Sequence, residues 1–336
     1  MTFRGFLQNA RLPVIQAPMA GASTPKMAIS ASNCGVLGSI GCGMMQPNAL
    51  KSAIRETKAG TERPFNVNLF VTDNQEGYNV DSVRDRLAWL YDYYTEMGLD
   101  SPRPSTFAPK FEEQFEALLE AQPPIASFVF GGIDIARVIG AATTPTEAEY
   151  WQRVGADGIV LQGIEAGGHR CSFLDPENPG EPLSELLKAT RHLHTPLIAA
   201  GGIMNGGDVR GALRQGADCA QLGTAFLTTE ESPVPASYRE SLIAAHNDDT
   251  TLTKAFSGRW ARGIRNRFTD MAGVQFTAPY PVQNALTQPL RSNAATHHRS
   301  AELSLWAGMG VGAVRDSPST PHLIDKLQRE YDGYNI

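Results

Sequence analysis

Residues 158–170 read GIVLQGIEAGGHR, an apolar run that opens into a loop with two adjacent glycines and one imidazole. A run that is apolar throughout, here Gly158–Gln162, is typical of a parallel strand buried on both faces. Paired glycines let the main chain approach a ligand closely. Histidine, here His169, is the residue type whose side chain changes its charge nearest to neutral pH. The stretch therefore predicts a buried strand whose end presents one titratable group, with a structural histidine in a tight turn as the alternative.

Seven further short apolar runs share this character: Val14–Met19, Val36–Ile40, Phe65–Phe70, Ile125–Phe130, Arg137–Ala142, Pro196–Ala200 and Cys219–Phe226. Helix-length polar segments separate most of them, at Pro25–Ser32, Pro47–Thr57, Lys110–Ala121, Pro145–Val154, Leu183–Arg191 and Gly207–Gln215. Eight strands that alternate with helices favour an α/β fold of the (β/α)₈ TIM-type barrel class over an open sheet. In such barrels the chemistry lies at the C-terminal ends of the strands.

Three parts of the chain interrupt or follow this alternation. Thr72–Ser105 is polar and aromatic, and it predicts a helical insertion after the third strand. The rhythm stops at about Glu230, so we expect a barrel over residues 1–228 and a smaller cap domain over 229–312. Residues 313–336 contain the amphipathic stretch Pro321–Tyr331, which predicts a helix that returns to the barrel wall.

Composition narrows the function classes. The 336 residues are 42% hydrophobic and 19% charged. A formal net charge of −6 argues against nucleic acid as a partner. The sequence has no apolar run long enough to span a membrane and no signal-peptide layout at its start, so we expect a cytoplasmic protein. Its four cysteines form no CxxC pair and its paired histidines lack a third ligand at sensible spacing, so we expect no metal site.

Glycines at the seventh and eighth strand ends indicate a phosphate site. AAGGI at 199–203 and CAQLGTA at 219–225 follow these strands, where barrels often bind phosphate. The donors would be the backbone N–H groups of Gly201, Gly202, Gly223 and Thr224. At the first strand end, the small residues and the proline of Gln16-Ala17-Pro18-Met19-Ala20-Gly21 leave room for a flat ring, and Met19 could pack on it. Because no P-loop or G-x-G-x-x-G pattern is present, these features favour FMN over a Rossmann dinucleotide.

Seven segments together resemble the nitronate monooxygenase family, formerly called 2-nitropropane dioxygenases. They are VIQAPMAGA (14–22), FNVNLF (65–70), GADGIVLQGIEAGGHR (155–170), PLIAAGGI (196–203), GADCAQLGTAFL (216–227), SGRWARGIRNRF (257–268) and LWAGMGVG (305–312). FMN-dependent enoyl-acyl-carrier-protein reductases carry a similar AGGH loop. The resemblance implies an FMN-dependent oxidation of alkyl nitronates, such as propionate 3-nitronate, by O₂ to a carbonyl compound and nitrite, without a nicotinamide.

The resemblance also implies residue roles. His169 would face the substrate, mainly to orient the anionic nitro group by hydrogen bonding, and would act as a base only toward a neutral nitroalkane. The FMN-binding residues would be Ala17, Pro18, Met19, Asn66, Gln162, Gly167, Gly168, Ala200, Gly201, Gly202, Gln221, Leu222, Gly223 and Thr224. Met19, Arg262, Tyr280 and Met309 would line the substrate pocket.

Two positions depart from the family pattern, and other readings stay open. Cys171 stands where the family usually has Gly, and Met309 replaces the Gln of WAGQG. We interpret the arginines of SGRWARGIRNRF as structural residues that donate to carbonyls rather than as an anion site, with Arg262 as the exception considered.

An NAD(P)H-dependent FMN reductase acting on enoyl thioesters or quinones is the main rival function, and a non-catalytic flavin-binding barrel is a remote one. A homodimer is compatible with the sequence.

Overall fold

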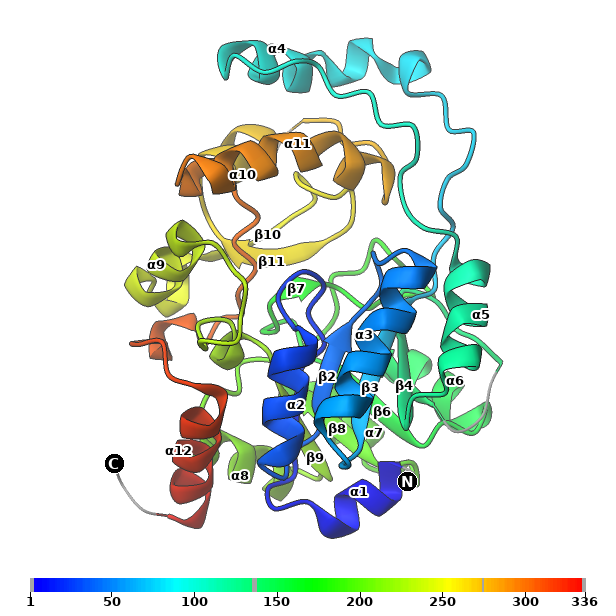
Figure 1. The fold of residues 1–336 in the computed structure, drawn as a ribbon, viewed down its shortest axis with the longest axis vertical. Coiled ribbons are helices and arrows are strands. Elements are labelled where there is room, and N and C mark those ends of the chain that lie inside the picture. The colour runs from blue at the N-terminus through cyan, green and yellow to red at the C-terminus, as the bar shows by residue number, and fades with distance from the viewer. Residues whose placement is uncertain (1–2, 135–137, 274, 334–336) are drawn as a thin grey trace.

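The computed structural model describes residues 3–134, 138–273 and 275–333. A barrel forms the lower part of the molecule in Figure 1, and a second layer of helices lies above it. Arg137, the first residue of the predicted fifth strand, lies outside the described residues. Within the described ranges, no helix has both the length and the apolar character needed to cross a membrane.

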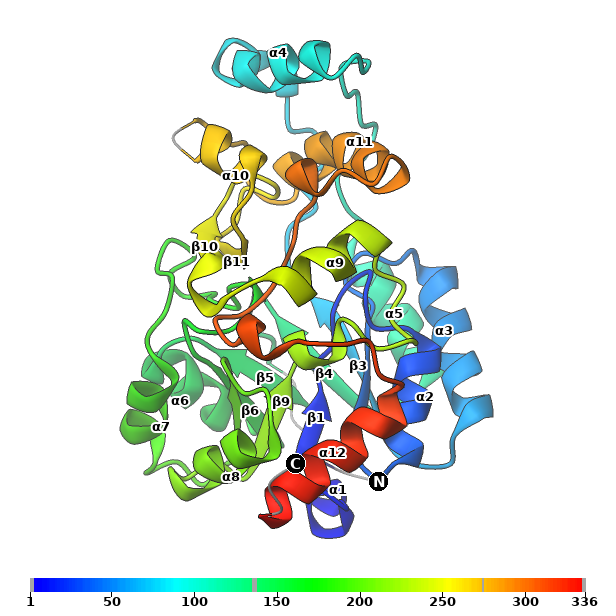
Figure 2. The ribbon, with the colours of Figure 1, turned by 90° about the vertical axis from the view of Figure 1, so that its left-hand side faces the viewer.

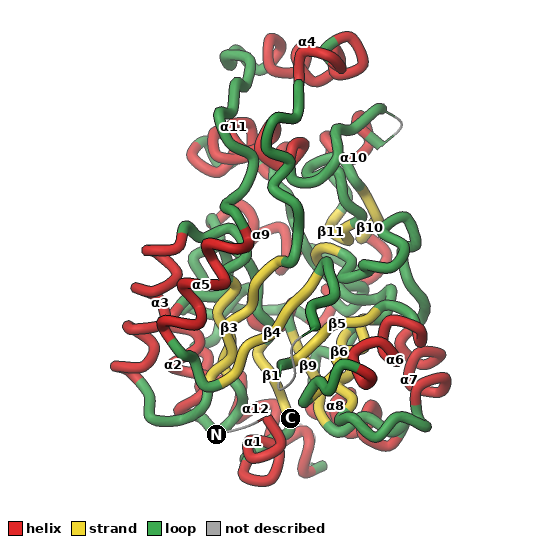
Figure 3. Tube along the Cα trace, turned by 90° about the vertical axis from the view of Figure 1, so that its right-hand side faces the viewer, coloured by secondary structure: helices red, strands yellow, loops and turns green. Residues whose placement is uncertain are grey.

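Eight parallel strands form the barrel wall, in the order β1-β9-β8-β6-β5-β4-β3-β2. Their bounds are β1 Val14–Gln16, β2 Gly38–Gly41, β3 Phe65–Phe70, β4 Ile125–Val129, β5 Ile139–Ala142, β6 Gly158–Gln162, β8 Leu197–Ala200 and β9 Cys219–Leu222. Figure 3 shows β3 and β4 side by side in this wall. The N–H of Gln16 donates to the carbonyl of Leu37 at 2.9 Å, which joins the first strand to the segment that leads into β2. The sheet is thus nearly closed, and the predicted TIM-type barrel is confirmed.

Helices cover the outside of this wall. They are α2 Pro25–Asn33, α3 Pro47–Gly60, α5 Phe111–Ala121, α6 Pro145–Arg153, α7 Leu183–Thr190, α8 Gly206–Arg214 and α12 Thr320–Asp332. Thr24 and Thr144 accept the N–H of the third following residue and a proline begins each helix, so local capping sets where α2 and α6 start. The short helix α1 (Phe3–Asn9) packs Phe3 and Phe6 against the inward side chains of the strands, at the end away from the cap.

Much of the C-terminal third of the chain, before α12, forms a cap over the barrel mouth (Figure 2). It contains α9 Ala236–Ala244, β10 Thr250–Thr253, β11 Ala261–Ile264, α10 Arg267–Ala272 and α11 Val282–Thr296, with short 3₁₀ turns η4 Asn247–Asp249, η5 Ser300–Glu302 and η6 Val311–Ala313. Another 3₁₀ turn, η3 Thr224–Phe226, directly follows β9. A third strand in the cap sheet is β7, Gly168–His169, which pairs antiparallel with β11. The histidine loop therefore belongs to both layers: it leaves the barrel at β6 and is fixed by the cap.

The insertion after β3 packs onto the cap. It holds η1 Val80–Val83, η2 Asp85–Leu87 and α4 Ala88–Glu96, which Figure 1 shows beyond α10 and α11. The hydroxyl of Tyr94 donates to the carbonyl of Leu286 at 2.7 Å, and that of Tyr93 to the Glu302 carboxylate at 2.9 Å. Two distant chain segments thus share one hydrophobic cluster above the barrel. The division at residues 228 and 312 stays a prediction.

Candidate active site

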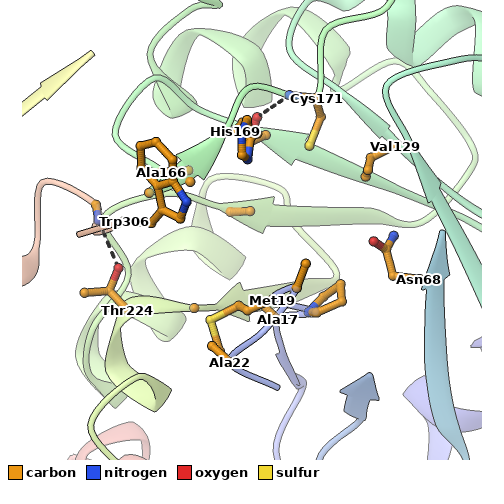
Figure 4. Close-up of a pocket in the computed structure, with 18 of the residues that line it drawn as sticks. Ala17, Met19, Ala22, Asn68, Val129, Ala166, His169, Cys171, Thr224 and Trp306 are labelled. Carbon is orange, nitrogen blue, oxygen red and sulfur yellow. Dashed lines mark hydrogen bonds between the residues drawn. The ribbon is translucent and has the colours of Figure 1, made fainter. Parts of the chain in front are cut away.

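A cavity of about 680 Å³ lies where the strand ends meet the cap. This volume is within the usual range for small-molecule sites. Figure 4 shows His169 facing Ala17 and Met19 across the open space, with Trp306 and Thr224 to one side and Asn68 to the other. The carboxyl ends of several strands therefore contribute to a single site, as the barrel class leads one to expect.

Most residues predicted from the sequence do line this cavity. They are Ala17, Pro18, Met19, Gln162, Gly167, Gly168, His169, Ala200, Gly201, Gly202, Gln221, Gly223, Thr224 and Tyr280. Four predicted residues do not: Asn66, Leu222, Arg262 and Met309.

Asn66 lies one layer too deep in the barrel. It is buried, and its amide donates to the hydroxyl of Ser127 at 2.9 Å. Residues two apart on a strand share a face, and it is Asn68 that reaches the cavity, donating to the same Ser127 hydroxyl at 3.0 Å. Leu222 is buried too, but in the apolar cluster between strands and helices.

Arg262 and Met309 are used outside the cavity. The guanidinium of Arg262 donates to the carbonyl of Ile164 at 2.8 Å and to the hydroxyl of Thr250 at 3.1 Å, so it ties the histidine loop to the cap. Met309 is 40% exposed, while its N–H donates to the carbonyl of Glu165 at 2.9 Å. Arg262 thus bonds a carbonyl and a hydroxyl, and the Met309 thioether does not line the cavity.

Open backbone donors gather on one side of the cavity. Within the described ranges, the N–H groups of Gly201, Gly202, Gly223 and Thr224 meet no hydrogen-bond acceptor. Gly201 and Gly202 have φ of 132° and 70°, which favour glycine. A Cβ on Gly223 would lie 3.5 Å from the nearest protein atom, so the polypeptide itself does not require glycine there. Backbone N–H groups need hydrogen-bond acceptors, and several unpaired N–H groups side by side are suited to bind an anion such as a phosphate.

Ala17-Pro18-Met19 forms a wall held by one hydroxyl. The N–H of Met19 donates to the hydroxyl of Ser23 at 2.8 Å, and that hydroxyl donates to the carbonyl of Met19 at 3.1 Å. The N–H of Gly41, at the end of the neighbouring strand, also donates to it at 2.9 Å. This wall of the cavity is therefore preorganised.

Gln162 supports the histidine loop through both ends of its amide. Its Nε2 donates to the carbonyl of His169 at 2.9 Å, and its Oε1 accepts the N–H of Cys171 at 2.9 Å. The predicted role of reaching a ring in the cavity competes with these bonds, because both amide atoms already have partners.

Arg170, next to the histidine, is fully buried and acts as a clamp. Its guanidinium donates to the carbonyls of Gln162, Gly163, Ala166 and Pro179 at 2.8–3.3 Å. Both ends of the loop are thereby fixed to a single planar group.

Replacing Arg170 with Met should destabilise the protein by at least about 3 kcal/mol, because several buried carbonyls would lose their donors together. Urea unfolding followed by circular dichroism measures this change. Arg265→Met is the matched control, since the Arg265 side chain is 61% exposed and makes a surface ion pair with Asp270. Equal losses in the two variants would contradict the clamp.

His169 sits in an aromatic enclosure. The rings of Phe130, Tyr280 and Trp306 lie 5.8, 5.8 and 5.2 Å from its own, measured between centroids. Its Nε2 lies 2.9 Å from the hydroxyl of Ser257, a cap residue. Burial, reinforced by nearby arginine charges, lowers the pKa of His169 to about 3, so the ring is neutral at ordinary pH.

Sequence reasoning missed several cavity residues. Asn68, Phe130 and Trp306 lie within quoted motifs or strands, but no pattern indicated which way they point. Asn284, Gln288 and Arg291 come from α11, more than a hundred residues from the histidine loop. Only their spacing of four and three, which puts them on one helical face, could have grouped them.

A family model described as nitronate monooxygenase matches residues 7–330. The chain belongs to the nitronate monooxygenase family. A probable nitronate monooxygenase from Staphylococcus aureus is 38% identical to it, over 91% of this chain and 91% of the relative. A probable nitronate monooxygenase from Staphylococcus haemolyticus is 36% identical, over 95% of this chain and 94% of the relative. The protein is therefore an enzyme of an oxidoreductase family.

Solved structures agree with this assignment. A nitroalkane oxidase from Streptomyces ansochromogenes matches with a TM-score of 0.89 and 34% identity, over 97% of both chains. FabK from Thermotoga maritima has a TM-score of 0.75 at 24% identity, over 99% of this chain and 96% of that one, a likeness that shows the shared fold alone.

Cys171 lines the cavity. Burial raises the pKa of its thiol to about 11, so the thiol stays protonated at neutral pH. A protonated thiol is a poor nucleophile, and the side chain therefore fits the role of a small space-filling group.

Proposed function

We propose that this protein uses FMN to oxidise alkyl nitronates with O₂, giving a carbonyl compound and nitrite without a nicotinamide. One observation carries the proposal. A neutral, positioned imidazole and a set of open backbone N–H groups border the same cavity. The first suits a small reacting molecule and the second suits the phosphate of a cofactor.

The cavity residues fit FMN. Gly201, Gly202, Gly223 and Thr224 would hold the phosphate, and Ala17-Pro18-Met19 would support one face of the ring system. The side chain of Thr224 already accepts the N–H of Gly308 at 3.0 Å, which leaves its hydroxyl hydrogen for a phosphate oxygen. When bound, FMN would take electrons from the nitronate and pass them to O₂.

The hydrogen bonds around Ser257 favour one tautomer of His169. The Ser257 hydroxyl donates its single hydrogen to the carbonyl of Arg259 at 3.1 Å, so it can only accept from His169 Nε2–H. Nδ1 then carries a lone pair and has no partner in the described part of the chain. His169 is thus arranged to accept a proton rather than to donate a hydrogen bond to a nitronate oxygen.

In this arrangement His169 would have different roles with a nitronate and with a neutral nitroalkane. A nitronate has already lost its proton, so the protein needs only to bind and orient it. A neutral nitroalkane must first lose a proton, and Nδ1 would take it. The anion that forms beside the new imidazolium offsets the burial penalty that otherwise holds the pKa of His169 low.

The pH profile tests this state of His169. With a pKa of about 3 in the folded protein, the imidazole takes up a proton only far below neutrality. We expect kcat/KM for a nitroalkane to show no His169-dependent loss between pH 8 and pH 5. An imidazole with the ordinary pKa of about 6.5 would be mostly protonated at pH 5. A fall near pH 6.5 that disappears in His169→Asn would contradict the low pKa.

Product analysis tests the function. Purified protein with ethylnitronate in air should consume O₂ and release nitrite without added NADH, and acid-released cofactor should have the mass of FMN. Turnover that requires NADH or NADPH would favour the reductase rival, and absence of turnover with any donor would favour a non-catalytic flavin-binding barrel. An FAD mass would exclude the proposed cofactor.

A further inference from the structure

The hydrogen bonds of His169 leave the nitro group of a substrate without a donor from the imidazole. Nε2–H is directed to the hydroxyl of Ser257 at 2.9 Å and Nδ1 carries a lone pair, so this tautomer has no hydrogen left for an oxygen in the cavity. The oxygens of a nitro group become negative when the neighbouring carbon loses its proton. A donor aimed at that developing charge would lower the barrier, and the residues around His169 are where such a donor would lie.

Tyr280 borders the cavity directly beside the imidazole. Its ring centroid lies 5.8 Å from that of His169 and 5.5 Å from that of Phe130, and both pairs meet edge to face. Because Tyr280 and His169 line one cavity at this separation, a small molecule between the barrel and the cap can contact both side chains.

The hydroxyl of Tyr280 has only a weak partner. Among the described residues, its one hydrogen bond goes to the thioether sulfur of Met44, at 3.4 Å. A thioether is a weak acceptor, so a negatively charged oxygen would readily replace it. Burial raises the pKa of Tyr280 above its ordinary value, although Arg259 and Arg291 oppose this effect, so the hydroxyl keeps its hydrogen at neutral pH.

Tyr280 and Ser257 stand on two cap loops that one buried amide joins. The side chain of Gln283 is fully buried, and its Nε2 donates to the carbonyl of Ala255 at 2.9 Å. Its Oε1 accepts the N–H of Ala278 at 3.1 Å. Ser257, which orients the imidazole, and Tyr280 therefore belong to one packed unit, and their positions relative to His169 are set together.

We propose that the Tyr280 hydroxyl donates a hydrogen bond to the nitro group and is thereby a second catalytic residue beside His169. This inference rests on the proposed function. With a neutral nitroalkane, the C–H proton moves to Nδ1 of His169 and the electron pair of that bond forms a C=N bond. One N=O bond becomes N–O⁻, and the hydroxyl donates to that oxygen. With a pre-formed nitronate the charge is already present, so the same hydrogen bond contributes to binding.

Trp306 is a second ring donor close to His169, with centroids 5.2 Å apart. Figure 4 shows it on the side of Thr224, which follows β9 and belongs to the proposed phosphate donors. Tyr280 packs instead on Phe130, which follows β4, the strand opposite β9 in the order of the barrel. The indole N–H thus suits the phosphate end of the cofactor, and the Tyr280 hydroxyl suits the reacting molecule.

Tyr280→Phe tests the proposal, because it removes the hydroxyl and keeps the ring. With nitroethane we expect kcat to fall by about 10- to 100-fold and KM to change by less than about threefold, since the lost hydrogen bond strengthens mainly in the transition state. With ethylnitronate we expect KM to rise by about 10- to 100-fold and kcat to change by less than about threefold, since the lost bond stabilised an anion already present. Tyr91→Phe, on α4 and outside the cavity, is the matched control and should behave as the parent.

Nitrate tests the same contact without turnover. It is a planar anion with its oxygens on nitrogen, and a flavin cannot oxidise it. Titration of the holoenzyme with nitrate, followed through the flavin absorbance, should give a Kd about tenfold or more higher for Tyr280→Phe than for the parent. The Tm and the FMN occupancy of the variant should equal those of the parent.

Met44→Leu separates a contact with substrate from a tie between barrel and cap, because it keeps the hydroxyl and removes its thioether partner. Losses in Met44→Leu equal to those in Tyr280→Phe would overturn the proposal. Unchanged kinetic constants and nitrate affinity in Tyr280→Phe, loss of its FMN at normal Tm, or a loss confined to Trp306→Phe would overturn it too. If the parent protein consumed neither nitroethane nor ethylnitronate, the proposed function would fail, and the nitrate titration would still decide whether Tyr280 donates to an anion in the cavity.

Discussion

Replacing His169 with Asn should lower turnover of neutral nitroalkanes by about 10²–10⁴-fold, the usual contribution of a positioned proton acceptor. Asn cannot accept the proton, and no carboxylate or second histidine from the described residues lines the cavity to replace it. With pre-formed nitronates the loss should be much smaller, because no proton has to be removed. The ratio of the two effects therefore measures the base role separately from binding.

Steady-state O₂ consumption with nitroethane and with ethylnitronate measures that ratio. Flavin absorbance and Tm of the variant should match the parent, since the His169 side chain makes one hydrogen bond to the described residues, with the hydroxyl of Ser257. His322→Asn, at an exposed position on α12, is the matched control. Unchanged rates with both substrates would remove His169 from the chemistry and return the AGGH loop to a structural role.

Replacing Gly223 with Val should abolish stable FMN binding. The protein has room for a Cβ there, with 3.5 Å to Ala17 Cβ and 3.6 Å to Met19 Sδ. The substitution should therefore leave the fold intact while its side chain blocks approach of a phosphate to the N–H groups of Gly223 and Thr224. A folded but colourless protein is the expected result.

The ratio of flavin to protein absorbance gives the FMN occupancy, and circular dichroism reports the fold. Gly211→Val serves as the control, because a Cβ on this α8 residue meets nothing within 4 Å and Gly211 does not line the cavity. Full occupancy in Gly223→Val would show that the phosphate binds elsewhere.

The barrel could be predicted because its signals are local. The run Gly158–Gln162 coincides with β6, and Phe65–Phe70 with β3, because strands buried on both faces are apolar from end to end. The proline-led helix starts at Pro25 and Pro145 were also visible, since capping depends on adjacent residues. Strand ends then indicated where a site would form.

The rest depends on three-dimensional packing. Asn66 and Asn68 have the same side chain and share a face of one strand, so only the depth of the barrel decides which of them reaches the cavity. Arg262 was a candidate for the substrate pocket, yet its partners are the carbonyl of Ile164 and the hydroxyl of Thr250, which the fold brings close to it. Arg291 stands in an amphipathic helix whose inward face only the barrel mouth defines.

Anaerobic mixing tests the central claim most directly. The purified holoenzyme is mixed without O₂ with propionate 3-nitronate or with NADH. The absorbance of the oxidised flavin, at about 450 nm for flavins in general, is then followed over time. We expect the nitronate to change this absorbance within the time of turnover and NADH to leave it unaltered. Rapid bleaching by NADH, with no response to the nitronate, would contradict the proposed reaction and identify a nicotinamide-dependent reductase instead.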